Sequence, residues 1–389
     1  MARKTKEELN EIKKQFGVDK IHSWSEYKTL KEDKYAYYLK YVLHKDEDRM
    51  DSIYTFSGSA CHQVLEDFYT KKITYDDMIN QYEDSLMEMN IAELKYDRTN
   101  AEKNEIIANK YEECIRHFFK NHNIVEHLHE VEKYLLIQIS PEIIMQGYLD
   151  FIHTEPDGSI IITDYKTSTL YRGEKIQNES GQLLIYAEGM RQTLNIPLEM
   201  IKCRWNFLKY VDVTVLQANG KWKSRIIERN AIGSSLVNSV SMWLKKSGYN
   251  ENEIENYIAD ISFENTLDKL PQEVREKFVI QDCYVYISVI QENIDALKED
   301  IIISFESIDD DIKKYNEIKM KTGKEDDTIF WQEVTDKDEY RLNVLGGHSR
   351  RLHKPLDEYL KQKEMFSQVA KEEANEDSED AFIDFLSQL

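Results

Sequence analysis

Hydrophobic and polar positions change their spacing along the chain, and the changes predict an ordered series of elements. Helical spacing of apolar residues predicts helices over Ser23–Val42, Ala60–Lys71, Tyr75–Leu94 and Ala101–Asn121. Alternation then predicts three consecutive antiparallel strands over Val131–Ile139, Ile143–His153 and Ser159–Thr167. A helix over Glu179–Leu194 and strands over Met200–Leu216 and Ser224–Arg229 follow. A strand, helix and strand after a meander indicate a mixed sheet in an α/β fold.

The rest of the chain is predominantly helical in pattern, with helices expected over Ala231–Lys246, Glu251–Asp260 and Asp282–Tyr315. We therefore expect a helical N-terminal region over residues 1–125, a core over 126–230 and a mostly helical C-terminal region over 231–370. Residues 371–389 form an acidic tail that ends in a short apolar stripe, Asp380–Leu389.

The loop between the second and third strands fixes how they pair. In the segment Glu155–Gly158, proline suits a type I turn and Gly158 can adopt positive φ. A loop of three residues with a bulge at Gly158 would bring Asp150 opposite Asp164. A loop of two residues would instead place these aspartates on opposite faces of the sheet.

The residues near the hairpin have the chemistry of a metal site. Asp164 and Lys166 are separated by one residue and so project from the same face of their strand. Together with Asp150 they offer two carboxylates and one ammonium, the set that metal-dependent hydrolysis of a phosphodiester requires. On the predicted helices, His62 shares a face with Glu66, and Gln182 shares one with Tyr186.

Composition restricts the setting in which this chemistry would work. The 389 residues include 41% hydrophobic ones, enough for a packed core. No apolar run approaches the roughly 20 residues of a membrane span, and we expect a soluble, cytoplasmic protein that does not enter a membrane. The four cysteines are far apart and form no CxxC pair, which predicts neither a zinc ribbon nor an iron-sulfur cluster.

The formal net charge of -22 argues mildly against a polyanionic partner. Charge is unevenly distributed, because the segment Gly347–Lys354 (GHSRRLHK) is locally basic. This basic cluster would either hold phosphates of DNA or be an ordinary solvated loop, and the sequence favours neither.

In their order along the chain, these motifs resemble the PD-(D/E)XK nuclease superfamily, specifically its RecB-type exonuclease branch, over Ser23–Ala187. The residues that carry the resemblance are Gly58, His62, Leu65 and Glu66 in a Gly-x-x-x-His-x-x-Leu-Glu pattern, Gly147 and Asp150 in Gly-x-x-Asp, Asp164 and Lys166 in Asp/Glu-x-Lys, and Gln182 and Tyr186 in Gln-x-x-x-Tyr. The resemblance implies a restriction-endonuclease-like mixed β-sheet core flanked by helices, with helical N-terminal and C-terminal additions.

The resemblance also assigns roles. His62, Asp150, Asp164 and the backbone carbonyl of Tyr165 would bind Mg²⁺ or Mn²⁺. Lys166 would either orient the attacking water or neutralise charge in the transition state.

Three further assignments concern neighbouring residues. Gln182 and Tyr186 would contact the substrate strand or brace the catalytic lysine. Glu66 would position a ligand or pair with a neighbouring lysine. Glu132, on the preceding strand, would extend the acidic site, but an exposed strand glutamate is the simpler interpretation.

The expected activity is that of a metal-dependent DNA nuclease, an exonuclease that acts on single-stranded DNA or free ends in recombination, repair or replication. The alternative is a catalytically silent nuclease-fold protein that binds or regulates, such as an acidic DNA mimic. The stripe Asp380–Leu389 would dock on a replication or recombination protein or close the domain's own core.

Overall fold

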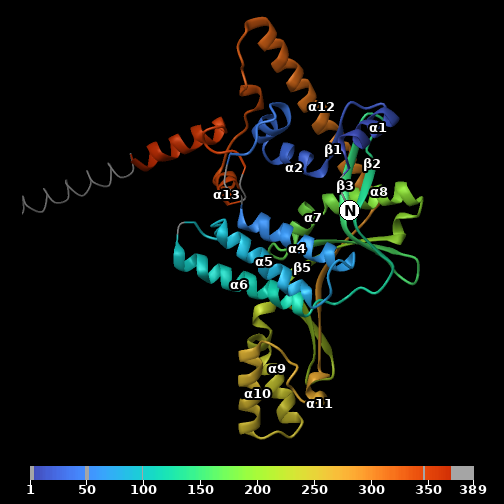
Figure 1. The fold of residues 1–389 in the computed structure, drawn as a ribbon, viewed down its shortest axis with the longest axis vertical. Helices are drawn as coiled ribbons and strands as arrows, with labels where there is room; N and C mark the ends of the chain where they lie inside the picture. Colours follow the sequence, from blue (N-terminus) through green and yellow to red (C-terminus); the bar gives the residue numbers. More distant parts are fainter. Residues whose placement is uncertain (1–3, 49–51, 99, 345–346, 369–389) are drawn as a thin grey trace, which may run out of the picture. The chain divides into compact units, whose positions relative to one another are not determined.

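The structure is a computed structural model, and it describes residues 4–48, 52–98, 100–344 and 347–368. The chain forms two compact units. Unit 1 comprises Met1–His22 and Ile53–Asp300, and unit 2 comprises Ser23–Ser52 and Ile301–Leu389 (Figure 1). The sequence predicts regions over residues 1–125, 126–230 and 231–370 from composition and pattern. Their boundaries remain a prediction, because the two compact units divide the chain in a different way.

A mixed sheet organises unit 1, and within the described residues it has seven strands. Its order is β1-β3-β4-β5-β6, with β2 paired to β3 and β7 paired to β5. The strands are β1 (Ile21–Ser23), β2 (His129–Gln138), β3 (Ile144–Thr154), β4 (Ile160–Lys166), β5 (Ile201–Leu216), β6 (Trp222–Glu228) and β7 (Phe278–Ile287). The expected α/β class and mixed sheet flanked by helices are confirmed.

The hairpin between β3 and β4 has the register that its loop predicts. Phe151 pairs with Thr163 across the antiparallel ladder, so the same register continued outward opposes Asp150 and Asp164. The Glu155 amide donates to the Ser159 carbonyl at 2.8 Å, and the Gly158 amide donates back to the Glu155 carbonyl at 2.9 Å. Gly158 has φ +83°, the left-handed conformation that the bulged loop requires.

One face of the sheet is covered by α8 (Gly181–Leu194), which follows the short α7 (Glu174–Glu179). This connection joins β4 to β5, and the two strands are parallel. The helix approaches β2 closely at Gly189, where a Cβ would lie 2.5 Å from Cγ1 of Ile137. β4 is buried along nearly its whole length, as expected for a central strand with helices on both faces.

The opposite face is covered by α4 (Ile53–Tyr69), α5 (Asp77–Ile91) and α6 (Ala101–Lys120). Their apolar faces share one core with Phe151 and Tyr165 of the sheet. The helices begin and end close to the ranges expected from spacing, except that α4 starts at Ile53, well before Ala60. Within unit 1, α1 (Lys6–Phe16) begins at Thr5, whose side chain forms a capping box with Glu8.

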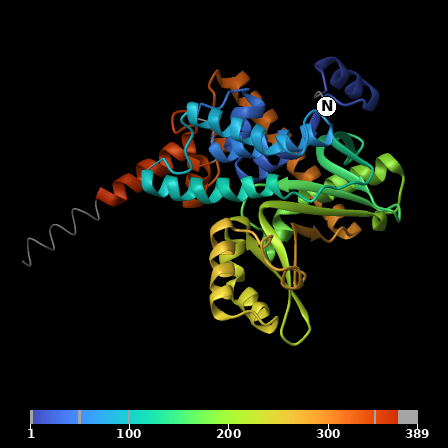
Figure 2. The ribbon, with the colours of Figure 1, turned by 60° about the horizontal axis from the view of Figure 1, so that its bottom comes forward.

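β5 continues past β4 and forms the backbone of an arm, defined here as residues 210–282. The second half of β5 pairs with β6 on one side and with β7 on the other. The helices α9 (Ile232–Lys246), α10 (Glu251–Glu264) and α11 (Gln272–Arg275) pack on one face of these strands around a separate apolar core. Figures 1 and 2 show α9 and α10 lying side by side next to the β5–β6 hairpin.

One element of the arm differs from the sequence prediction. A helix was expected from Asp282, but residues Phe278–Ile287 form β7, and α12 (Gln291–Thr322) starts only afterwards. The segment FVIQDCYVYI is rich in aromatic and β-branched residues, which favour a pleated surface.

Unit 2 contains α2 (Trp24–Glu32), α3 (Lys34–Tyr37), the π-helix η1 (Tyr38–Val42) and α13 (Asp336–Val344), and residues 354–368 are also helical. The single helix predicted over Ser23–Val42 is interrupted at Asp33, whose carboxylate caps α3 by accepting from the Ala36 amide. Ser23 caps α2 as expected. Inside the unit, Asp33 forms a buried ion pair with His353 at 3.0 Å.

Short 3₁₀ segments complete the described structure: η2 (Leu198–Met200), η3 (Arg229–Ala231) and η4 (Thr328–Phe330). Of the helices in the described ranges, none is both long enough and apolar enough to cross a membrane. The tail 371–389, with its predicted docking stripe, lies outside the described residues.

Candidate metal centre

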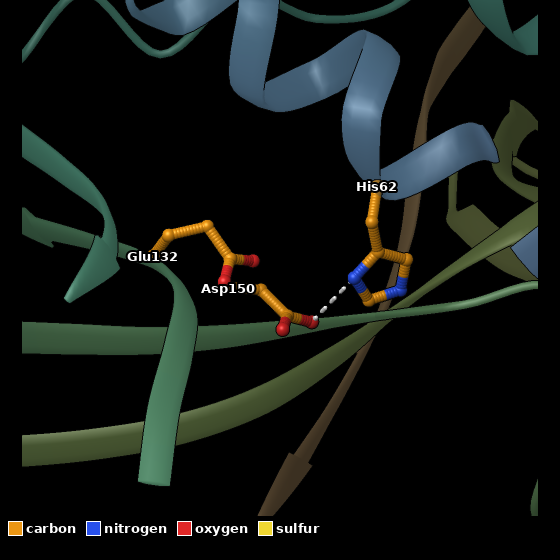
Figure 3. Close-up of side chains that lie close together, drawn as sticks. All are labelled: His62, Glu132 and Asp150. Carbon is orange, nitrogen blue, oxygen red and sulfur yellow. Dashed lines mark ion pairs between the residues drawn. The ribbon is translucent and has the colours of Figure 1, made fainter. Parts of the chain in front are cut away.

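His62 reaches the sheet from the middle of α4. Its Nε2–H donates to the backbone carbonyl of Tyr165 at 3.0 Å, and its Nδ1 lies 3.5 Å from Oδ2 of Asp150 (Figure 3). Both ring nitrogens therefore face residues that the sequence analysis assigned to the site. At Gly58, one turn earlier on the helix, a Cβ would make an ordinary contact of 3.5 Å with Thr167 Oγ1, so no close approach requires glycine there.

Asp150 lies where β3 separates from β4. The ladder's last pair at this end is Phe151 with Thr163, so beyond it β3 offers no backbone partner to Tyr165. The Asp150 side chain replaces that partner, because its Oδ2 accepts from the Tyr165 amide at 2.9 Å. The strands thus separate at the point where the two aspartates would face each other.

Asp164 and Lys166 project from the same face of β4, as their spacing predicts. The Lys166 ammonium lies 2.6 Å from Oδ2 of Asp164. Asp164 is only 5% exposed, and its Oδ2 accepts no hydrogen bond of normal geometry within the described structure. A buried carboxylate oxygen held by an ion pair alone is an acceptor suited to a cation.

The charges of these groups are strongly coupled. Burial disfavours the charged form of His62, but the Asp150 carboxylate outweighs it and raises the pKa of His62 to about 9. Burial likewise opposes ionisation of Asp150, and His62 together with Lys166 nevertheless lowers its pKa. Burial and the negative charge of Asp150 raise the pKa of Asp164. The Lys166 ammonium lowers it, but by less. Lys166 stays charged, because the two aspartates outweigh its burial and raise its pKa.

Glu132 of β2 joins this group. One ligand atom each from His62, Glu132 and Asp150 lie within 4.8 Å of one another, and Figure 3 shows the two carboxylates side by side with the imidazole. Burial, with the charge of Asp150, raises the pKa of Glu132. The interpretation of Glu132 as an exposed strand glutamate is wrong, since its side chain is half-buried beside Asp150.

The backbone of Glu132 is unusual. Its φ is +47°, a left-handed conformation that non-glycine residues rarely adopt. The β2–β3 ladder pairs Val131 with Phe151 and Lys133 with Leu149, and it omits the position between them. By that register Glu132 stands opposite Asp150.

A family comparison agrees with this geometry. Residues 22–277 match the family model of the PD-(D/E)XK nuclease superfamily. The chain belongs to this superfamily. A search of curated proteins finds no match.

Membership of the PD-(D/E)XK superfamily suggests a hydrolase that acts on nucleic acids, although the fold also occurs in catalytically inactive proteins. PD-(D/E)XK nucleases generally use divalent metal ions, and the residues present fit such an ion. The donor set combines carboxylate oxygens with one imidazole. The Asp164 carboxylate, whose Oδ2 is already paired with the Lys166 ammonium at 2.6 Å, is a further oxygen donor near them.

Gln182 and Tyr186 lie on one face of α8, next to the PD-(D/E)XK strands. The Gln182 amide donates to the Tyr186 hydroxyl at 3.1 Å. Burial raises the pKa of Tyr186, and the charges of Asp150 and Asp164 contribute to the rise. The Tyr186 ring lies against β3 at Gly147, where a Cβ would meet Tyr186 Cε1 at 2.4 Å. The glycine of the Gly-x-x-Asp motif therefore makes room for the tyrosine of the Gln-x-x-x-Tyr motif.

Two other candidates lie differently. Glu66 is outside the three-residue group within the described residues, and its Oε1 lies 3.8 Å from the Lys72 ammonium. The basic cluster of unit 2 has its charge neutralised internally, since Arg350, Arg351, His353 and Lys354 each pair with a carboxylate of the same unit. A cluster paired in this way has little charge left for phosphates.

Glu132 is the site residue that sequence reasoning undervalued, and a signal for it exists. The Ile139 amide donates to the Ile143 carbonyl at 3.0 Å across the turn between β2 and β3. Pairing Ile139 with Ile143 fixes the register of β2 against β3. Counting along both strands from this pair places Glu132 opposite Asp150. The register of the first hairpin would therefore have shown it.

Proposed function

We propose that this protein is a metal-dependent DNA nuclease of the RecB-type branch, which hydrolyses phosphodiester bonds. The observation that carries the proposal is the convergence of His62, Glu132 and Asp150 within 4.8 Å, beside a buried Asp164 paired with Lys166. Surface ion pairs do not bring an imidazole, three carboxylates and an ammonium from one helix and three strands to one place.

The metal would be held by His62, Asp150 and Asp164, with Glu132 as an additional carboxylate and the Tyr165 carbonyl as the predicted backbone ligand. A divalent ion bound there polarises the phosphate and lowers the pKa of a bound water. Because imidazole suits transition metals better than Mg²⁺, we expect Mn²⁺ to bind more tightly than Mg²⁺.

Lys166 would act on the phosphate or on the attacking water. An ammonium carries three donors and no acceptor, so it can hold an oxygen or stabilise negative charge. Its partner Asp164 fixes it 2.6 Å away on the same strand face. Loss of one such donor from a transition state typically costs about 3 kcal/mol, roughly a hundredfold or more in rate.

Gln182 and Tyr186 would line the substrate side of the centre. Their mutual hydrogen bond and the close fit of Tyr186 against Gly147 hold the phenol near Asp150 and Asp164. DNA as substrate, action at free ends and a setting in recombination, repair or replication rest on the order of the RecB-type motifs, from Gly58 and His62 to Tyr186.

The test is a cleavage assay in the presence of Mg²⁺, Mn²⁺ or EDTA. The substrates are linear, circular and flapped DNA, and the two ends of each linear substrate are labelled in separate samples. The parent is compared with Lys166→Ala and with Lys202→Ala, a control lysine on the neighbouring β5 that lies near the Ser159 hydroxyl. Cleavage by the parent and the control, with at least a hundredfold loss in Lys166→Ala, supports the proposal. Equal inactivity of all three would favour a silent nuclease-fold binding protein.

The role of Glu132 is tested by the affinity for Mn²⁺ and not by cleavage. Titration calorimetry with Mn²⁺ should show weaker binding by Glu132→Gln than by the parent, because a ligand carboxylate becomes a neutral amide. Glu130→Gln is the matched control, since Glu130 lies on the same strand but pairs with Lys133 at 2.6 Å. Unchanged Mn²⁺ affinity in Glu132→Gln would remove this residue from the centre.

A further inference from the structure

The outer end of the arm combines lysines with indole rings. Trp222 begins β6 and is 50% exposed, with Lys221 and Lys223 on either side. The ammonium groups of Lys246 and Lys277 lie 4.8 and 5.5 Å from the ring of a second tryptophan, Trp243. We call Lys221, Trp222, Lys223, Lys246 and Lys277 the arm tip.

The five residues lie near the same end of the arm, but Trp222 and Lys223 are consecutive in β6 and so project from opposite faces of the hairpin. The Trp243 indole donates to the Leu216 carbonyl at 2.7 Å, and the Leu216 amide donates to the Lys277 carbonyl at 2.8 Å. The Lys246 ammonium donates to the Ala218 carbonyl at 3.3 Å in the hairpin loop. Trp222 pairs with Leu216 across the β5–β6 ladder.

The lysines of the arm tip differ from the basic cluster of unit 2 in having no carboxylate partner among the described residues. The Tyr249 hydroxyl donates to the Glu273 carboxylate at 2.7 Å and lowers its pKa, and the positive charge of Lys277 adds to this effect. In a chain with a net charge of -22, four lysines that form no ion pair among the described residues make this end of the arm locally positive. A phosphate backbone is complementary to such a surface.

The metal centre and the arm are parts of one strand system. Lys166 at the end of β4 pairs with Phe207, and β5 continues from there to Leu216 at the arm tip. At about 3.3 Å per residue this stretch spans roughly 25 to 30 Å. A stacked strand, as in duplex DNA, rises about 3.4 Å per phosphate, so about eight stacked nucleotides cover the distance and fewer nucleotides of an extended single strand do so.

The centre and Trp222 also lie on the same face of the sheet. Asp164 pairs with Trp205, and Trp205 pairs with Val285 of β7, so these three share a face. Val279 lies six positions before Val285, and successive residues alternate, so Val279 is on that face as well.

The remaining steps lead from β7 to Trp222. Val279 pairs with Thr214, and Leu216, two residues further along β5, pairs with Trp222. The indole therefore projects on the same side of the sheet as Asp164. No helix of the arm covers this side, because the arm's core forms on the face of Val213 and Val215. Lys223 pairs with Val215 and projects to that other face, where Trp243 lies beside Lys246 and Lys277.

The arm is anchored at its base by a buried charge network. Arg229 and Asp282 are each 1% exposed and pair at 2.5 Å, and His122 lies 3.0 Å from the same aspartate. Asn265 ties the loop after α10 to the Arg229 carbonyl at 2.6 Å. Such a base holds the tip at a fixed displacement from the metal centre.

We infer that the arm tip is a second contact for the single-stranded nucleic acid whose phosphate occupies the metal centre. Trp222 stacks on an unpaired base on the face of the metal centre, and the four lysines bind phosphates of nucleotides that continue past the end of the hairpin. This inference rests on the proposed function for its substrate. A strand of about three nucleotides held at the centre is too short to reach the tip, even when it is extended.

The experiment measures binding by fluorescence anisotropy in EDTA, so that no strand is cut, with single strands of about 3 and about 30 nucleotides and a duplex of about 30 base pairs. Trp222→Ala should bind the long single strand about five- to a hundredfold more weakly, and Trp222→Phe should restore most of the affinity. Lys221→Gln/Lys223→Gln should lower the slope of log affinity against log salt by about 1.4.

The matched control is Lys13→Gln/Lys14→Gln on α1, which removes the same charge from two neighbouring lysines that are also without a carboxylate partner among the described residues. It should leave the slope nearly unchanged. Hydrolysis of the short strand in Mn²⁺ should have the same kcat/KM in Trp222→Ala as in the parent.

The outcomes separate this inference from the proposed function. Binding of the long strand by Trp222→Ala and by the lysine variant as tightly as by the parent overturns the inference, even when Lys166-dependent cleavage is present. Loss of long-strand binding in these variants supports it, even when no metal gives cleavage and the nuclease proposal fails. An equal loss with the duplex and the single strand would refute stacking by Trp222.

Discussion

Replacing Gly147 by alanine tests how two motifs fit together at the centre. The added Cβ would lie 2.4 Å from Cε1, 2.9 Å from Cζ and 2.9 Å from Oη of Tyr186. Tyr186 is 6% exposed, and its hydroxyl already accepts a hydrogen bond from Gln182, so the ring has little freedom to move. Gly147 lies inside β3 and is not among the glycines with positive φ, so alanine costs nothing through the backbone itself.

The magnitude follows from the overlap. Carbon atoms pack at about 3.5 to 4.0 Å, so the ring must shift by more than about 1 Å. Overpacking of this kind costs about 1 to 3 kcal/mol. A domain of this size loses roughly 2 to 4 °C of Tm per kcal/mol, and a fall of roughly 2 to 12 °C is expected. Cleavage should also slow, because Tyr186 stands beside Asp150 and Asp164.

The assay is thermal and urea unfolding of Gly147→Ala, Tyr186→Ala and the double variant. With the ring removed, the extra methyl group has space, so Gly147→Ala should cost little in the Tyr186→Ala background. Gly58→Ala is the control: its Cβ makes only a 3.5 Å contact, and alanine in a helix should stabilise by up to about 1 kcal/mol. An equal cost of Gly147→Ala in both backgrounds, or no cost in the parent, would refute the argument.

Three further expectations concern stability. Asp282→Asn should lower the free energy of unfolding by about 3 to 5 kcal/mol in urea titrations, because it leaves the buried charge of Arg229 uncompensated. Burial and the charge of Arg229 lower the pKa of His117 to about 4. Between about pH 6.5 and pH 4 the imidazole is therefore protonated in the unfolded chain and neutral in the folded chain. Stability should thus fall between about pH 6.5 and pH 4, and urea titrations at pH 7 and pH 5 should show a smaller fall for His117→Gln. Gly158→Ala should cost about 1 kcal/mol, measured by its Tm, because alanine is strained at φ +83°.

The sequence predicts the β3–β4 hairpin well for a local reason. Pairing of β3 with β4 depends on one short loop, and the turn preferences of Pro156 and Gly158 determine its length. Once that register is known, the positions of Asp150 and Asp164 follow by counting. The same holds for Lys166, whose face depends only on the alternation along a strand.

Prediction fails where distant segments decide the structure. β7 is a strand because β5 extends beyond β4 and offers it an edge, and no local pattern near Asp282 contains that information. The division of the predicted N-terminal helix at Asp33 is similar, since that carboxylate also pairs with His353, far along the chain. In both places a tertiary partner outweighs helical spacing.

Glu132 shows the most informative failure, because a local preference is violated at the centre itself. A glutamate at φ +47° stores on the order of 1 to 3 kcal/mol of strain, and it persists only where its surroundings impose it. Here the paired residues on both sides, Val131 with Phe151 and Lys133 with Leu149, hold the backbone in place. The strained backbone places a third group that could hold a metal ion beside His62 and Asp150. No preference for strand or turn favours that conformation, so the rule that predicts the rest of the sheet fails at the candidate metal centre.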